Sequence, residues 1–315
     1  MDDKKFMKVS SNPHIRAHSS TSSIMLIVIL SLLPPAIFGI HNFGIRALWV
    51  ILISVASCIL FEWMFNKISK KPVSITDFSC IVTGLLLALN LPSSVPWWLP
   101  VIGSFFAIVV VKMIFGGLGK NIMNPALGAR CFLLISFPKL MTDFACDAYS
   151  GATPLAQLKS GDLVVPVRQM IIGNISGTIG ETSMLAIVFG GCIMIMFGVI
   201  DLYVTGSYIA SFVLFLIMFA GRGIDVPFIC AHISGGGLML GAFFMATDYV
   251  TRPVTKSGQI IYGIILGLLT CLFRVFGPSA EGVSYAIIIG NLLVPIIEKF
   301  TVPTPFGVKK VKGGK

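Results

Sequence analysis

The sequence predicts an all-α integral membrane protein with about ten transmembrane helices, arranged as two inverted five-helix repeats that contain interrupted helices. Three observations support this fold class: an apolar composition, ten apolar runs, and a similarity between the two halves. Of the 315 residues, 56% are hydrophobic and only 11% are charged, whereas soluble domains carry about 25% charged residues. A soluble cytosolic enzyme is therefore excluded.

Ten apolar runs, bounded by charged residues, glycine or proline, are the expected spans, because a helix needs about 20 mostly apolar residues to cross about 30 Å of hydrocarbon. They are 24–40, 45–65, 75–91, 97–115, 122–139, 184–201, 207–221, 227–247, 259–276 and 283–298. The third, fifth and eighth are short, or contain Asn-Pro or Gly-Gly-Gly. Interrupted helices are tolerated where protein or an internal cavity satisfies the backbone. This pattern favours a carrier over a simple anchor.

The two halves of the sequence resemble each other at an offset of about 160 residues. The segment "TGLLLALNLPSSVPWW" in the first half is similar in pattern to "GAFFMATDYVTRPVT" in the second. With five helices in each half, an odd number, the second half must enter the membrane from the opposite side. The similarity therefore predicts an inverted repeat, with a pathway where the halves meet.

The basic residues predict the orientation of the chain. If the N-terminus is cytoplasmic, sixteen of the Lys and Arg residues fall on the cytoplasmic side and six on the outer side. This bias is the usual one for membrane proteins, so we expect both termini in the cytoplasm. The expected segments are a cytoplasmic N-terminal segment 1–23, a first five-helix repeat 24–139, an outward-facing loop 140–183, a second repeat 184–298 and a basic cytoplasmic tail 299–315.

Charge and cysteine patterns exclude several other functions. The net charge of +10 comes from short clusters between apolar runs, which indicates a lipid membrane and not nucleic acid as the partner. The seven cysteines are spread singly without a C-x-x-C pair, so we expect neither a metal site nor an iron–sulfur cluster. No catalytic side chain is predicted. Asp77 and Asp248 flank the short third and eighth runs and are candidates for an ion or proton path.

The outward loop contains the segments with the strongest chemical signal, "DAYSGATPLAQL" (147–158) and "GNISGTIGETS" (173–183). Their glycines and small side chains leave backbone N–H groups open to an anionic or aromatic ligand. The same residue types are also common in ordinary loops.

Within the first segment, Asp147-x-x-Ser150-Gly151-Ala152-Thr153 resembles the D-x-x-[ST]-G-A-[TS] motif at which a flavin transferase attaches FMN through a phosphoester. Three further motifs, "GGLGKNIMNPA" (116–126), "GTIGETS" (177–183) and "ATDYVTRPVT" (246–255), follow the same order as in the RnfD subunits of Rnf complexes, which are related to the NqrB subunits of sodium-pumping NADH:quinone reductases. The resemblance covers essentially the whole chain.

This resemblance implies a covalent FMN on Thr153, with the transferase recognising the four other motif residues: Asp147, Ser150, Gly151 and Ala152. Residues of the second loop segment are expected either to line the flavin ring or phosphate, or to form a tight turn and the N-cap of the sixth helix. They are Gly173, Gly177, Gly180, Glu181 and Thr182.

Asn121 and Asn124 open the fifth run. The resemblance implies a second, non-covalent riboflavin beside them, because relatives hold one near this motif. The alternative is that both asparagines form hydrogen bonds between helices, since an amide in hydrocarbon needs a partner.

The resemblance implies a membrane electron relay in the bacterial inner membrane, which couples electron transfer between ferredoxin and NAD to Na⁺ or H⁺ translocation. Expected partners are the flavin-bearing RnfG, the membrane proteins RnfA and RnfE, soluble subunits that handle NADH and ferredoxin, and the flavin transferase. The chain lacks a G-x-G-x-x-G nucleotide motif of its own. Two alternatives remain: a component of a sodium-pumping NADH:quinone reductase, and a solute transporter or channel on the same scaffold.

Overall fold

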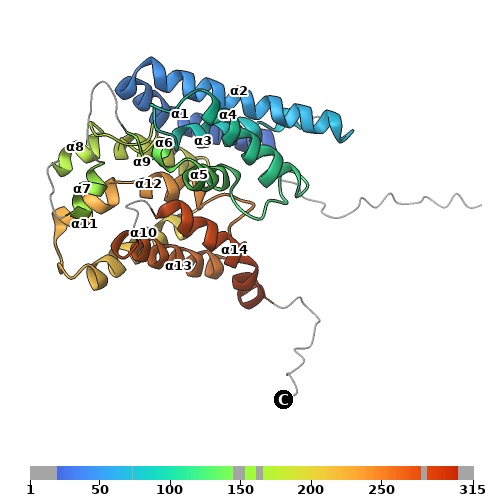
Figure 1. Ribbon diagram of the computed structural model, residues 1–315. Helices are drawn as coiled ribbons and strands as arrows, with labels where there is room; N and C mark the ends of the chain where they lie inside the picture. Colours follow the sequence, from blue (N-terminus) through green and yellow to red (C-terminus); the bar gives the residue numbers. More distant parts are fainter. Residues whose placement is uncertain (1–19, 73, 145–152, 161–165, 278–281, 304–315) are drawn as a thin grey trace, which may run out of the picture.

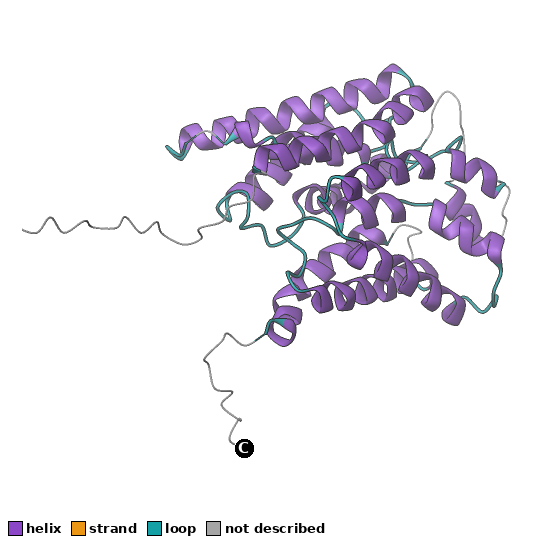
Figure 2. Cartoon of the chain, turned by 180° about the vertical axis from the view of Figure 1, so that it is seen from behind, coloured by secondary structure: helices purple, strands orange, loops and turns teal. Residues whose placement is uncertain are grey.

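The computed structural model describes residues 20–72, 74–144, 153–160, 166–277 and 282–303 (Figure 1). Within these ranges the chain is helical, with turns and loops and no strand (Figure 2). The elements are α1 (Thr21–Phe43), α2 (Ile45–Ile68), η1 (Ile75–Asp77), α3 (Ser79–Leu89), α4 (Trp98–Phe105), η2 (Phe106–Met113), α5 (Pro125–Ser136), α6 (Pro138–Met141), α7 (Pro154–Ser160), α8 (Val167–Ile172), α9 (Met184–Met196), α10 (Leu202–Phe219), α11 (Val226–Ser234), α12 (Leu238–Leu240), η3 (Gly241–Met245), α13 (Lys256–Val275) and α14 (Val283–Thr301).

The predicted all-α membrane fold is confirmed, and each of the ten apolar runs coincides with a helix or a broken helix. Five helices are long and apolar enough to cross a membrane: α1, α2, α10, α13 and α14. A sixth candidate is the pair α11 and α12–η3, which is bent by 62° at its break. The other apolar helices, α3, α4–η2, α5 and α9, are shorter than a full span.

Two of the predicted runs were too long, and backbone conformation explains both. The third run, predicted over 75–91, is a 3₁₀ turn followed by an 11-residue helix, because Phe78 between them adopts a left-handed conformation with φ 61°. The sixth run, predicted over 184–201, ends at Met196, and Gly198 follows with φ 65°. A residue with positive φ ends the regular backbone hydrogen bonding of a helix.

The two halves of the chain pack as two groups of helices that meet through α1, α5, α9 and α14. In the first half, α2 lies against α3 and α4; in the second, α10 lies against α13, and α13 against α14. Between the halves, α1 contacts α9 and α5 contacts α14. Figure 1 shows α1 and α2 along one side of the molecule, α10, α13 and α14 along the other, and α5, α9 and α12 between them. The first helices of the two halves thus contact each other, and so do the last helices.

Close approach between α10 and α13 depends on glycine. A Cβ atom on Gly267 of α13 would lie 2.0 Å from Ser211 Oγ and 2.6 Å from the backbone nitrogen of Phe212 on α10. In membranes, helices associate mainly through tight packing of small residues, because lipid supplies no hydrophobic drive between them. Gly267 therefore sets the spacing of this helix pair.

Gly267→Ala should destabilise the protein by about 1–3 kcal/mol, because the new methyl group overpacks an interface formed partly by backbone. We would measure thermal unfolding of the detergent-purified chain by intrinsic fluorescence. Gly206→Ala on α10 is the matched control, since its Cβ would meet nothing within 4 Å. A helix glycine replaced by alanine in open space should be neutral or slightly stabilising. Equal melting temperatures for the two variants would contradict the packing argument.

Candidate functional site

Thr153 lies at the start of α7, where its side chain is partly buried. Its carbonyl oxygen accepts a hydrogen bond from the backbone N–H of Gln157 at 3.0 Å. Its Oγ1 accepts one from the N–H of Ala156 at 3.3 Å. These two bonds fix the threonine at the helix entrance. The other residues of the flavin-attachment motif, Asp147, Ser150, Gly151 and Ala152, lie outside the described residues.

A small hollow of about 10 Å³ lies beside Thr153. It is lined by Thr153, Pro154, Leu155, Ile175, Ser176, Gly177, Glu181, Gly235 and Gly236. The structure therefore brings Thr153, Gly177 and Glu181 together beside the glycines between α11 and α12. Thr182 is buried but does not line the hollow. A hollow of this volume holds about one water-sized group. It is too small for a three-ring flavin.

The second loop segment, 173–183, is fixed by backbone contacts with the end of α3. The N–H of Ile179 donates to the carbonyl of Leu91 at 3.0 Å, and the N–H of Gly180 donates to the carbonyl of Leu89 at 2.8 Å. A Cβ on Gly180 would lie 2.6 Å from Leu89 Cβ, so only glycine fits there. Ser183 forms the N-cap of α9. This segment contains the turn and the cap that the sequence offered as its structural alternative.

Glu181 forms a buried ion pair with Arg130 of α5. The carboxylate Oε1 and the guanidinium Nη1 are 2.7 Å apart, and both side chains are at most 5% exposed. The same Nη1 donates to Asn90 Oδ1 at 2.5 Å, at the C-cap of α3. On its other side Glu181 touches the chain at Gly237, where a Cβ would lie 2.3 Å from Oε1. Glu181 therefore ties the loop to both halves, and its carboxylate is already engaged.

Arg274 of α13 satisfies the backbone at the break between α11 and α12. Its guanidinium donates to the carbonyl of His232, to that of Gly235 at 2.9 Å and to that of Gly236 at 2.7 Å. The last carbonyls of a helix have no partner within the helix, and in a membrane no water replaces it. One buried arginine thus makes the interruption of this span tolerable.

A second, central cavity of about 80 Å³ lies where the two halves meet. It is lined by Ile24, Met25, Val28, Ser79, Val82, Thr83, Leu86, Lys112, Leu118, Asn121, Asn124, Pro125, Met194, Val199, Ile200, Phe244, Thr247, Asp248 and Tyr249. Both π-helical segments, η2 and η3, supply lining residues. Such segments are rare and frequently occur at functional sites.

The two asparagines of the fifth run have different roles in this cavity. Asn124 is the N-cap of α5, and its Oδ1 accepts from the backbone N–H groups of Ala126 at 3.1 Å and Leu127 at 3.4 Å. Its Nδ2 donates to the carbonyl of Met245 at 3.4 Å. Asn121 Oδ1, in contrast, is buried and has no hydrogen-bond partner within the described part of the chain. Buried polar atoms are normally paired, so Asn121 is the one of the two that suits a ligand.

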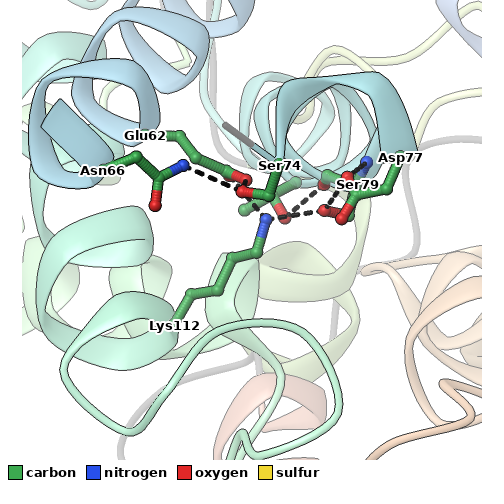
Figure 3. A network of polar contacts seen from close by, with 7 residues as sticks. Glu62, Asn66, Ser74, Asp77, Ser79 and Lys112 are labelled. Carbon is green, nitrogen blue, oxygen red and sulfur yellow. Dashed lines mark hydrogen bonds and ion pairs between the residues drawn. The ribbon is translucent and has the colours of Figure 1, made fainter. Parts of the chain in front are cut away.

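A network of buried polar side chains borders the same cavity (Figure 3). Lys112 Nζ lies 2.6 Å from Glu62 Oε2, and these side chains are 2% and 0% exposed. The ammonium also donates to Ser79 Oγ at 2.6 Å, and this hydroxyl donates to Asp77 Oδ1 at 2.6 Å. At the other end Ser74 Oγ donates to Glu62 Oε1 at 2.6 Å. The network joins α2, the start of α3 and η2.

This network contains a lysine whose burial was not predicted and a glutamate that was missed. Lys112, one of the sixteen cations counted on the cytoplasmic side, is buried and paired with Glu62. Glu62 was not singled out, although a lone glutamate within "ILFEWMF" and a lone lysine within "VVVKMIF" indicate a buried ion pair. The two path candidates, Asp77 and Asp248, are both associated with the central cavity, since Asp248 lines it and Asp77 binds Ser79.

Comparison with known proteins gives full-length matches. The model of the NQR2, RnfD, RnfE family matches residues 8–307. The RnfD subunit of the Na⁺-translocating ferredoxin:NAD⁺ oxidoreductase complex of Acetobacterium woodii is 45% identical over 97% of each chain. The corresponding subunit of the proton-translocating ferredoxin:NAD⁺ oxidoreductase complex of Clostridium ljungdahlii is 40% identical over 98% of each chain. That of the ion-translocating oxidoreductase complex of Actinobacillus succinogenes is 33% identical over 95% of this chain and 98% of the relative.

Lys112→Met should destabilise the protein by about 3–5 kcal/mol, because it leaves the Glu62 carboxylate buried without a counter-charge. Adding Glu62→Gln should recover part of this loss, since no uncompensated charge then remains. Unfolding in a denaturant series on the purified chain, analysed as a double-mutant cycle, gives the coupling. Lys120→Met, at an exposed lysine, is the control and should change little. Additive effects of the two buried substitutions would contradict the pairing.

Proposed function

Because the chain belongs to the NQR2, RnfD, RnfE family, we propose that it is the membrane electron-relay subunit of an Rnf-type complex. Such a complex couples electron transfer between ferredoxin and NAD to ion translocation. The proposal is supported by the full-length relatives from ferredoxin:NAD⁺ oxidoreductase complexes, one Na⁺-translocating and one proton-translocating. The ion that the complex translocates is accordingly Na⁺ or H⁺.

The first part of the proposal is a covalent FMN on Thr153. The observation that carries it is the position of Thr153, which ends the D-x-x-S-G-A-T motif and opens onto a hollow lined by glycines. Gly177 borders this hollow, and a Cβ on it would meet only Thr182 Cγ2, at 3.8 Å. This free space admits about one water-sized group, such as one oxygen of a phosphoester on Thr153 Oγ1. When bound, FMN supplies one-electron redox chemistry.

The protein residues around Thr153 would hold the linkage and not the flavin ring, since the hollow is too small for the ring. Glu181 would act indirectly: its ion pair with Arg130 fixes the 173–183 segment against the break between α11 and α12. The FMN transferase is a required partner during maturation and would recognise Asp147, Ser150, Gly151 and Ala152.

The second part of the proposal is a non-covalent riboflavin in the central cavity. Asn121 Oδ1 supplies an unpaired acceptor for a ring N–H group, and Thr83 and Thr247 add polar lining. Val28, Leu86 and other apolar side chains form the remaining wall. A cavity with apolar walls and a few placed polar groups is typical of cofactor sites. Its volume of about 80 Å³ holds about six water-sized groups, so the side chains of the wall would have to move apart to admit the three rings of a flavin.

The proposed partners and location follow from the same family. The partners are the flavin-bearing RnfG, the membrane proteins RnfA and RnfE, and the soluble subunits that handle NADH and ferredoxin. The chain would lie in the bacterial inner membrane with both termini cytoplasmic and Thr153 outward. Two other functions are weighed against this one: a component of a sodium-pumping NADH:quinone reductase, and a transporter or channel. A covalent flavin argues against the transporter, because a passive pathway has no use for it.

Thr153→Ala should abolish covalent flavin. We would express the full chain with its flavin transferase and measure intact mass and in-gel flavin fluorescence. The wild type should gain the mass of FMN minus water, Thr153→Ala should gain nothing, and Thr153→Ser should keep the modification. Thr142→Ala, at an exposed threonine in the same loop, is the control. An unmodified wild-type chain beside an active transferase would overturn the electron-relay proposal.

Asn121→Leu should lower the amount of non-covalent flavin bound in the cavity. We would make this change in a Thr153→Ala chain, which carries no covalent FMN, and measure the flavin that acid extraction releases. The substitution keeps the side-chain size but deletes the acceptor that faces the cavity. Losing one hydrogen bond to a buried ligand weakens binding by roughly tenfold. Asn174→Leu, at an exposed asparagine, serves as the control. Equal flavin release from both variants would place riboflavin elsewhere.

A further inference from the structure

A third cavity, of about 160 Å³, lies at the end of the molecule where α7, α8 and α11 gather (Figure 1). It is distinct from the central cavity and from the hollow beside Thr153, although Leu155 borders both it and the hollow. Its lining residues are Leu155, Leu158, Lys159, Ala220, Arg222, Phe228, His232, Arg274 and Val275. The electron-relay function assigns no role to this cavity.

The lining of this cavity is strongly basic. Lys159, Arg222 and Arg274 carry positive charge, and none of the described lining residues is acidic. Lys159 donates a hydrogen bond to the carbonyl of Gly277, which holds its ammonium group at the cavity. The Arg222 guanidinium lies 4.9 Å from the centre of the Phe228 ring, a stacked position that holds its planar donor fork in place.

A buried histidine provides an independent indication of a ligand. His232 is only 7% exposed and borders the cavity. Its Nδ1 has no hydrogen-bond partner among the residues that the structure describes. The ring is held in position by packing against Phe228, with ring centres 4.5 Å apart, and the His232 carbonyl accepts from Arg274. A buried and oriented ring nitrogen without a partner is uncommon, and a neutral imidazole can donate from this atom to an anion.

We propose that this cavity binds the phosphate group of an anionic ligand, between Lys159, Arg222 and the His232 ring. Arginine and lysine are the usual phosphate-binding side chains. The volume is roughly that of ten ordered water molecules at about 10–15 Å³ each, which is ample for a phosphate with its nearest substituent.

The surroundings favour a phospholipid headgroup as the source of this phosphate. The cavity lies at the last turns of α10 and α13, where two apolar helices end. Phe219, Ile224 and Phe276 are exposed large apolar side chains at these ends, and aromatic residues are enriched at the membrane surface. Basic pockets between membrane helices bind anionic lipid headgroups. An acyl chain attached to the phosphate would meet these apolar side chains, whereas free phosphate would not use them.

The test uses the full chain in bilayer discs of phosphatidylcholine with one-tenth phosphatidylglycerol, released gently and analysed by native mass spectrometry. The double variant Lys159→Gln/Arg222→Gln removes two exposed cations of the cavity. Its matched control is Lys139→Gln/Arg168→Gln, which removes two exposed cations that do not line it. His232→Phe keeps the ring packing and deletes the nitrogen. Thr153→Ala removes the covalent cofactor, and added inorganic phosphate tests the free anion.

We expect one tightly held phosphatidylglycerol per wild-type chain. Its affinity should fall roughly tenfold or more in the cavity double variant, because each cation near a phosphate adds several-fold, and several-fold in His232→Phe. The control pair and Thr153→Ala should retain it.

Saturable binding of inorganic phosphate that depends on Lys159 and Arg222, without retained lipid, would support the site with free phosphate as its source. Equal retention in both double variants would overturn the proposal, and so would loss of the signal in Thr153→Ala, since the phosphate would then belong to the cofactor.

Discussion

The architecture depends on one constraint: backbone groups released where a helix breaks must find partners inside the protein, because hydrocarbon offers none. One buried arginine meets this constraint directly: Arg274 binds the carbonyls at the break between α11 and α12. In the other half, Arg130 binds two side chains, those of Asn90 at the end of α3 and of Glu181 in the 173–183 segment. The end of α3, the break between α11 and α12 and the 173–183 segment are therefore held together by direct contacts.

These contacts fix the positions of the residues around Thr153. The 173–183 segment pairs its backbone with Leu89 and Leu91 and places Glu181 against Gly237. The end of α3 and the break between α11 and α12 thus support the segment that packs beside Thr153 at the start of α7. A buried ion pair contributes little net stability by itself, but removing one partner is strongly destabilising. The position of the proposed flavin linkage therefore depends on charges that never touch the flavin.

The sequence was sufficient to predict the fold class, because ten apolar runs and the bias of basic residues are direct consequences of the bilayer. Helix lengths were harder to predict. The left-handed conformation of Phe78 is unusual for a large side chain, and no residue pattern in "SITDFSC" predicts it. The burial of Lys112 was not predicted, since a lysine after an apolar run resembles a membrane-edge residue until its partner, Glu62, is known.

Candidate residues within one local motif could be picked out from the sequence, whereas those that depend on tertiary packing could not. Thr153 came from a motif, and motifs are local in sequence. The distinction between Asn121 and Asn124 required the start of α5, since only the structure shows which amide is used as a cap. The basic cavity could not be foreseen, because Lys159, Arg222 and Arg274 come from three separate segments that only tertiary packing brings together.

The short helices α3 and α5 also have an electrostatic consequence. Both begin at the central cavity, where Ser79 and Pro125 line the wall. The aligned peptide dipoles of a helix place about half a positive charge at its N-terminus. Lys112 is paired with Glu62, and the backbone N–H and hydroxyl of Ser79 at the start of α3 both donate to the Asp77 carboxylate. The start of α5, which is capped by the neutral Asn124, therefore remains as the source of positive potential beside the cavity. A cofactor bound in this cavity would be reduced more readily beside the start of α5, because the helix dipole stabilises added negative charge.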